Sequence, residues 1–244
     1  MPAPPAPLRL GVLALGDSIT NGGGELQWGV ALQSWALWLA RGLGVPYTGC
    51  AVDGATAAGV TGEQIPAFVR TAAAPGGPYD VGCLYIGVND VRGPGWDPDA
   101  YAGHLRAALS FLTARCERTL ACTLPLDLGR PRAGASVIAA NAAVAAEAAA
   151  AGALVCDLRG FGARGQVMVD HVHPTAFGQV AIAERALAVL AADGLPARLR
   201  PSTLVRYETS RRGRLRGDAT YAYRHAKVSV RAAYAGLRAA SMRL

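Results

Sequence analysis

Short apolar runs alternate with longer segments of helical periodicity through the first 195 residues. The runs have the length and composition of buried strands, and the longer segments repeat apolar residues every three or four positions. Strands are predicted at about 8–15, 47–52, 81–86, 119–124 and 153–156. Helices are predicted at about 28–43, 62–73, 98–114, 136–151 and from Pro174 to about 192.

This strict alternation of strand and helix predicts an α/β fold, with a central parallel sheet and helices on both faces. In a parallel sheet the carboxyl ends of all strands meet at one edge, where open α/β folds bind their ligands. The loops after the first, second, third and fifth strands are therefore the places to look for chemistry.

The loop after the first strand begins with Gly16, Asp17 and Ser18. A glycine at the end of a central strand allows a sharp turn, after which Ser18 projects from the carboxyl edge of the sheet. The same triplet is also typical of a turn or of a helix N-cap. Taken alone, it favours the structural interpretation.

Polar residues also occupy the three other loops, as Asp53-Gly54, Asn89-Asp90 and the segment from Asp170 to Pro174. Asp-Gly and Asn-Asp are ordinary turn dipeptides. A histidine before Pro174 is an ordinary way to enter a helix, with proline at the first helical position. Each loop alone is explained by structure.

Together, the four loops contain every group that acyl transfer needs. Ser18 is the candidate nucleophile, and its hydroxyl needs a base to take its proton. His173 is the candidate base, because an imidazole titrates near neutral pH. Asp170, three residues earlier, is expected to bind the other imidazole nitrogen and to stabilise the imidazolium. His171 is a second imidazole in this segment and an alternative base.

A tetrahedral intermediate also needs hydrogen-bond donors aimed at its oxyanion. The backbone N–H groups of Ser18 and Gly54 and the side-chain amide of Asn89 are the candidates. Asp53 would disturb this site unless its carboxylate points away. Asp17 and Asp90 are expected mainly to hold their loops by accepting hydrogen bonds from backbone N–H groups.

These four blocks resemble, in order, those of the SGNH/GDSL hydrolase family: Gly-Asp-Ser, a glycine after the second strand, Gly-x-Asn-Asp and Asp-x-x-His-Pro. The similarity extends from residue 10 to about residue 192. It implies a flavodoxin-like, three-layer α/β/α fold and an esterase or acyltransferase without a metal or organic cofactor. It also implies the roles given above for Ser18, Gly54, Asn89, Asp170 and His173.

Two segments are candidate walls of a substrate site. Residues 90–98 contain Arg92 and Trp96, and residues 21–28 end in Trp28. These three side chains, with Asp17, are the candidate substrate contacts, although the first segment is equally consistent with a rigid surface loop. Neither segment is long, which argues against a deep lipid tunnel. Short or medium acyl esters, or acetylated sugars or natural products, are the expected substrates.

The composition excludes several classes of protein. Just over half of the residues are apolar, which excludes a disordered chain. The sequence has neither a signal-peptide pattern nor an apolar stretch of roughly 20 residues, so a cytoplasmic location is expected. The five cysteines lack metal-site spacing, and most fall in or beside predicted strands, so they are expected to be reduced thiols.

Charge divides the chain into a core, residues 1–195, and a basic extension, residues 196–244. The core has 12 arginines against 15 acidic residues, a net charge of −3, whereas the extension has 12 basic and 2 acidic residues, a net charge of +10. A helix is predicted from Asp218, as its N-cap, to Ala240. Its alanine-rich stripe is expected to pack on the core or on a second copy of the chain.

Sharper interpretations of the extension are binding to an anionic membrane surface, to nucleic acid, or to an acidic carrier or phosphate-bearing acyl donor. Nucleic acid is disfavoured because no known nucleic-acid-binding motif is present.

Three hypotheses for the function of the protein follow from these observations. The first is a serine esterase acting on a small acyl ester, the second an acyltransferase whose extension holds the donor, and the third a binding protein that acts through its extension.

Overall fold

The computed structural model describes residues 10–26, 30–71 and 78–205, together with positions 210–213, 215–216, 218–219, 222–223, 226–227 and 230. Five strands form one sheet in the order β2-β1-β3-β4-β5, and every neighbouring pair is parallel. The strands are β1 (Val12–Gly16), β2 (Tyr47–Gly49), β3 (Tyr79–Tyr85), β4 (Cys116–Cys122) and β5 (Leu154–Cys156). The predicted α/β fold is confirmed.

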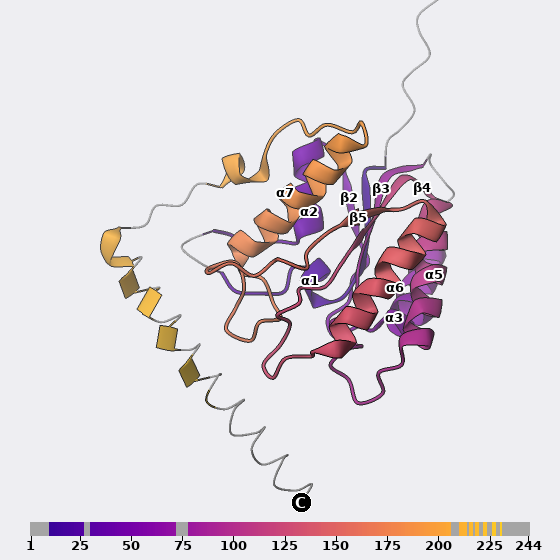
Figure 1. The fold of residues 1–244 in the computed structure, drawn as a ribbon. Helices are drawn as coiled ribbons and strands as arrows, with labels where there is room; N and C mark the ends of the chain where they lie inside the picture. Colours follow the sequence, from indigo (N-terminus) through magenta and orange to yellow (C-terminus); the bar gives the residue numbers. More distant parts are fainter. Residues whose placement is uncertain are drawn as a thin grey trace, which may run out of the picture.

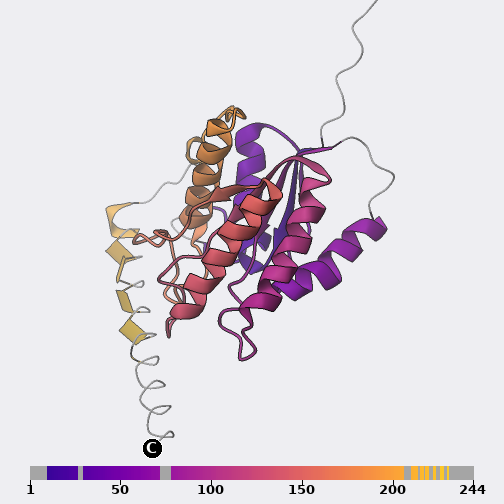
Figure 2. The same cartoon turned by 45° about the vertical axis from the view of Figure 1, so that its right-hand side comes forward.

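Helices cover both faces of this sheet, which gives three layers. Figure 1 shows α2 (Trp35–Leu43) beside α7 (Ala176–Ala192) on one face, and α5 (Pro98–Thr113) beside α6 (Ala135–Ala151) on the other. The rotated view in Figure 2 shows the same separation of the two helical layers. All five residues of β1 are buried between them, as expected for a central strand without a solvent-exposed face.

Shorter elements complete the connections. They are α1 (Ser18–Asn21), α3 (Ala57–Gly59), the π-helical turn η1 (Val60–Gln64), α4 (Ile65–Thr71) and the 3₁₀ turn η2 (Pro201–Leu204). Helix α1 follows β1 directly at the carboxyl edge of the sheet. Three of these elements, α3, η1 and α4, run on from one another and form a single helical segment between β2 and β3.

Two helices begin at positions other than those predicted. The first was expected from residue 28, but α2 begins at Trp35, because the Ser34 hydroxyl accepts a hydrogen bond from the Ala36 N–H and caps the helix there. Trp28 lies outside the described residues. The second was expected from residue 62, but the helical segment begins at Ala57, after the N-cap Thr56.

Strand β2 is shorter than predicted, yet the chain continues alongside β1. The Cys50 N–H donates to the Ala14 carbonyl over 2.9 Å, and the Val52 N–H donates to the Gly16 carbonyl over 3.2 Å. These bonds hold the chain after β2 against the end of β1. They bring the following turn, which contains Gly54, to the edge of the sheet where Ser18 lies.

All five cysteines are free thiols, as predicted, and all except the half-buried Cys50 are buried. Burial raises the pKa of the Cys83 and Cys122 thiols well above their usual range. Within the described part of the chain, no helix has both the length and the apolar character needed to cross a membrane.

The extension is only partly described. The Arg198 N–H donates to the Gly42 carbonyl over 2.9 Å, which ties the start of the extension to the end of α2. Beyond it, the described positions from 211 to 230 are helical. Asp218 is among them, so it is not the N-cap that was predicted, and it lies 3.5 Å from the Arg164 guanidinium. The rest of the predicted helix, to Ala240, lies outside the described residues.

Candidate active site

The first strand ends in a turn that only glycine fits. Gly16 has a φ of 155°, and a Cβ on it would lie 2.4 Å from the Tyr85 carbonyl oxygen and 2.6 Å from the Thr20 hydroxyl. The side chain of Asp17 then caps α1 by accepting a hydrogen bond from the Ile19 N–H over 2.9 Å. Strand, turn and cap together fix Ser18 at the first position of α1.

Ser18, His173 and Asp170 form a hydrogen-bonded chain. The Ser18 Oγ lies 3.0 Å from the Nε2 of His173, and the His173 Nδ1 lies 2.8 Å from the Asp170 Oδ2. The other carboxylate oxygen of Asp170 accepts from the backbone N–H groups of Val172 and His173. Asp170 is thereby fixed, and the imidazole that it holds faces the serine hydroxyl.

The negative charge of Asp170 and the positive charge of protonated His173 stabilise each other. The hydrogen bond to Asp170 raises the pKa of His173, although burial of the ring opposes this. Burial alone would raise the pKa of Asp170, but hydrogen bonds from His173 and from the backbone lower it below its usual range. Asp170 is therefore ionised at neutral pH, and His173 is a stronger base than a free imidazole.

The candidate oxyanion residues are linked to Ser18 by a series of contacts. The Asn21 amide, at the end of α1, donates to the Asp53 carboxylate over 2.9 Å, so this carboxylate is turned toward Asn21. Gly54 follows with a φ of 77°, and nothing lies within 4 Å of the position its Cβ would occupy. The Gly54 N–H donates to no acceptor among the described residues.

Asn89 reaches the same turn from the end of β3. Its Nδ2 donates to the Ala55 carbonyl over 2.9 Å, which orients the amide and leaves its second N–H for another acceptor. The neighbouring Asp90 accepts hydrogen bonds from the Ala57 N–H on both carboxylate oxygens. Asp90 therefore holds its loop, as predicted.

Asp17 is also a structural residue and is not placed to contact a substrate, because it is completely buried. Burial raises the pKa of this carboxyl group to about 7. Only one of its oxygens has a partner, the Ile19 N–H, and its Oδ2 has none within the described part of the chain. A buried carboxyl group with so few hydrogen bonds favours its neutral form.

Two buried glutamines that the sequence analysis did not single out support this site. Gln64, in η1, both accepts from the Gly16 N–H and donates to the Gly16 carbonyl. Gln179, in α7, accepts from the Trp35 N–H over 2.7 Å and donates to the carbonyls of Ile19 and Gly23. Neither glutamine has a local sequence signal, because the backbone groups that they bind are distant in the sequence.

One of the expected substrate walls borders a cavity of about 340 Å³ beside Asn89. Trp96 lines this cavity, and its ring is 5.3 Å from that of Tyr101, which fixes one side of the indole. Arg92 is exposed, and its charge opposes protonation of His173, so it lies near the imidazole.

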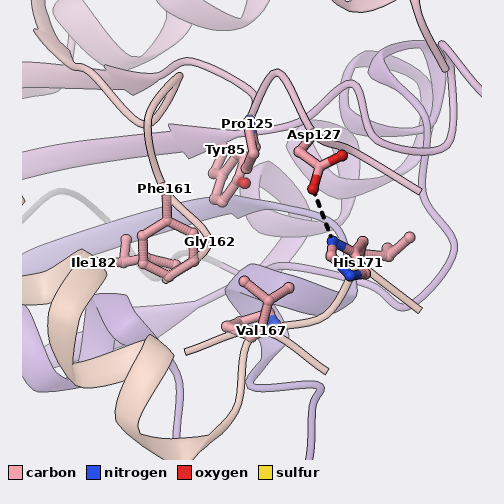
Figure 3. A pocket seen from close by; sticks show the side chains of 10 residues that line it. Tyr85, Pro125, Asp127, Phe161, Gly162, Val167, His171 and Ile182 are labelled. Carbon is pink, nitrogen blue, oxygen red and sulfur yellow. Dashed lines mark ion pairs between the residues drawn. The ribbon is translucent and has the colours of Figure 1, made fainter. Parts of the chain in front are cut away.

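His171, the alternative base, is paired with other side chains. Its side chain turns to the opposite side of its loop, where Nδ1 lies 3.1 Å from the Asp127 carboxylate (Figure 3). His173 alone among the two histidines contacts Ser18.

A serine, a histidine and an aspartate joined in this way, at the carboxyl edge of a three-layer α/β/α sheet, are the arrangement of a serine hydrolase. The model of the GDSL-like lipase/acylhydrolase family matches residues 14–181. The chain belongs to this family and is a serine ester hydrolase. No curated protein sequence matches the chain significantly.

Several solved structures have the same fold. An acetylxylan esterase from Geobacillus stearothermophilus is 18% identical, with 74% of this chain and 93% of that chain covered and a TM-score of 0.58. A member of the lipolytic G-D-S-L family from Veillonella parvula is 23% identical, with 74% of this chain and 98% of that chain covered and a TM-score of 0.59. An α/β hydrolase from the Lake Arreo metagenome, Spain, is 18% identical, with 74% of this chain and 94% of that chain covered and a TM-score of 0.59. At these identities the likeness concerns the fold.

Proposed function

We propose that this hydrolase cleaves esters of small or medium acyl groups, acetyl esters included, through an acyl-enzyme intermediate on Ser18. The observation that carries the proposal is the pair of contacts at His173, 3.0 Å from Ser18 Oγ and 2.8 Å from Asp170. These distances are within hydrogen-bond reach, so a proton can pass from the hydroxyl to the imidazole without movement of the backbone.

In the first half of the reaction, His173 Nε2 takes the Ser18 proton while Oγ attacks the ester carbonyl carbon. Asp170 stabilises the imidazolium that forms and keeps Nδ1 protonated. When the tetrahedral intermediate collapses, the bond to the alcohol oxygen breaks and His173 returns its proton to that oxygen. The acyl group stays on Ser18. In the second half a water molecule repeats the sequence and releases the acid.

The negative charge on the carbonyl oxygen needs fixed donors in the intermediate. The proposal assigns this role to the N–H groups of Ser18 and Gly54 and to the second Nδ2–H of Asn89. It is supported by the open space beside Gly54 and by the Ala55 carbonyl, which orients the Asn89 amide. Donors held in place before the reaction stabilise the transition state without reorganisation.

The cavity beside Asn89 is the proposed site for the substrate group that lies next to the carbonyl. A volume of about 340 Å³ fits a small group or a single sugar ring better than a long lipid chain. Trp96 provides a flat apolar wall on which such a ring can stack. The Geobacillus neighbour is an acetylxylan esterase, so an acetylated sugar is one candidate substrate.

The test is hydrolysis of p-nitrophenyl acetate, butyrate and decanoate, with acetylated xylose alongside, by the wild type and by Ser18→Ala. The proposal predicts the highest kcat/KM for acetate or butyrate and loss of all turnover in Ser18→Ala. Hydrolysis by Ser18→Ala at the wild-type rate would overturn the mechanism. A preference for decanoate would overturn the assigned substrate class and leave the mechanism standing.

A further inference from the structure

The loop that carries both Asp170 and His173 has little regular secondary structure of its own. An isolated antiparallel bridge between Val167 and Pro174 closes it, and the Met168 N–H donates to the His173 carbonyl over 2.8 Å. No strand or helix of the described fold includes residues 168–173. The geometry of Asp170 and His173 therefore depends on hydrogen bonds within the loop and on what holds the loop from outside.

The backbone at His171, between these two residues, is strained. Among the described residues, His171 is the only non-glycine residue with a positive φ, which is 55°. This left-handed conformation is unfavourable for a residue with a Cβ and persists only where surrounding contacts impose it. The first such contact is a hydrogen bond of 2.8 Å from the Gly129 N–H to the His171 carbonyl.

The second contact is a cluster of charged side chains from the loop between β4 and α6. The His171 Nδ1 lies 3.1 Å from the Asp127 carboxylate, and the Arg130 Nη2 lies 2.8 Å from Nδ1 and 3.0 Å from Nε2 of the same ring. Arg130 also binds both oxygens of Asp127, over 2.9 and 3.0 Å. Arg132 adds a contact of 2.6 Å to the same carboxylate. Asp127, Arg130 and His171 thus each have two or more partners.

Apolar side chains border a small cavity beneath the loop. Figure 3 shows Tyr85, Phe161 and Ile182 on the opposite side of a small cavity from the pair of Asp127 and His171. The cavity has a volume of about 40 Å³ and also borders Val172, directly before His173. The loop therefore has polar contacts on one side of this cavity and apolar side chains on the other.

We propose that Asp127, Arg130 and His171 form a clamp that holds the loop in the conformation in which Asp170 and His173 face Ser18. They are positioning residues for the reaction proposed above and touch neither the substrate nor Ser18. The proposal rests on the proposed function, since it assigns the clamp to the same site. It also explains why a second histidine lies two residues from the base: this side chain turns away and anchors the loop.

The experiment measures how fast Ser18 reacts with a fluorophosphonate probe, together with kcat and KM for p-nitrophenyl acetate. In Asp127→Asn the carboxylate is lost with little change of shape. In His171→Asn the ring is lost, but asparagine tolerates the left-handed backbone. We expect labelling and kcat to fall by about tenfold to a hundredfold in both variants, since a misplacement of about 1 Å has effects of this size. KM is expected to stay within about threefold.

Two further variants serve as controls. Asp127→Glu keeps the carboxylate at a partly exposed position, and it is expected to recover most of the lost rate. Glu147→Gln removes a comparable bidentate contact with Arg106, between α5 and α6, away from the loop. It is expected to label Ser18 at the wild-type rate, even if its melting temperature falls. A general loss of stability is thereby separated from an effect on the site.

The pH profile of His171→Asn gives a readout that a purely structural role would not change. Asp170 and Asp17 raise the pKa of His173, and Arg92 lowers it. If the loop loosens, the contact with Asp170 weakens, and the acid limb of kcat/KM shifts to lower pH. An unshifted limb, with labelling and kcat at wild-type values, would overturn the clamp.

The outcomes separate the clamp from the proposed function. If the wild type is not labelled at Ser18, the proposed function fails. If the wild type is labelled and both clamp variants are labelled equally fast, only the clamp fails. If neither clamp variant folds, as judged by circular dichroism, the clamp is also contradicted, because the cluster then holds the whole domain together.

Discussion

The hydroxyl of Ser18 lies 3.0 Å from the Nε2 of His173, although 155 positions separate the two residues in the sequence. The contact depends on the parallel sheet, which brings the end of β1 and the loop before α7 to the same edge. The proton acceptor and the hydroxyl are thus positioned by two elements that belong to one rigid core.

The first prediction concerns pH. His173 acts as a base only when neutral, and its pKa is raised above the ordinary value of about 6.5 by Asp170. We therefore expect kcat/KM to rise with pH, with the midpoint of the acid limb above 6.5. In Asp170→Asn the midpoint should move to lower pH and kcat should fall by roughly 10³ to 10⁴-fold. A midpoint that is the same in both proteins would contradict the assignment of Asp170.

The second prediction concerns the oxyanion. Asn89→Ala removes the amide that the Ala55 carbonyl orients. Loss of one donor of this kind is expected to lower kcat by about 10² to 10³-fold while KM changes little. Steady-state kinetics with p-nitrophenyl acetate provides the measurement. A kcat of the folded variant within threefold of the wild-type value would exclude Asn89 as an oxyanion donor.

The third prediction concerns the buried carboxyl group of Asp17, whose pKa is raised to about 7. A carboxyl group with a raised pKa binds its proton more tightly in the folded protein, so its contribution to stability falls as pH rises from about 4 to about 7. Asp17→Asn keeps an oxygen for the Ile19 N–H but does not ionise. The free energy of unfolding of the variant, relative to wild type, should therefore increase between pH 5 and pH 7 and level off at higher pH.

This increase is expected to be on the order of 1 kcal/mol per pH unit. Urea unfolding at several pH values measures it directly, and the difference between the two proteins cancels the contributions of all other titrating groups. A difference that does not depend on pH would show that Asp17 ionises as an ordinary exposed carboxyl group.

The fourth prediction concerns Gln179, whose amide bonds to the backbone of Trp35, Ile19 and Gly23. Gln179→Leu leaves three polar groups without this partner, and each lost partner costs about 1–3 kcal/mol where the group is buried. We expect the variant to be destabilised by at least about 2 kcal/mol in urea unfolding. Gln33→Leu is the matched control, because the one hydrogen bond of the Gln33 side chain within the described residues is to the exposed side chain of Arg41.

The fold was predictable because its buried strands are continuous apolar runs, such as Val81 to Tyr85, separated by helices of regular periodicity. The start of α2 was not predictable from periodicity. Leu32 and Trp35 share a helical spacing, but the cap at Ser34 places only Trp35 in the helix. Local hydrogen bonding here determines the boundary.

The site was predictable only in part. Ser18, Asp170 and His173 follow from their motifs, with His171 as the alternative base. The tertiary contacts separate the two histidines, because His173 lies beside Ser18 and His171 beside Asp127. The role of Gln179 was not accessible, because its backbone partners lie 144 to 160 positions away. A side chain with such distant partners leaves no local pattern.

The most direct test of the account is a mass measurement after reaction with a fluorophosphonate. A single adduct is predicted on the peptide that contains Ser18, and none is predicted in Ser18→Ala under the same conditions. An adduct on a different residue, or an adduct that persists in Ser18→Ala, would contradict the assignment of Ser18 as the nucleophile.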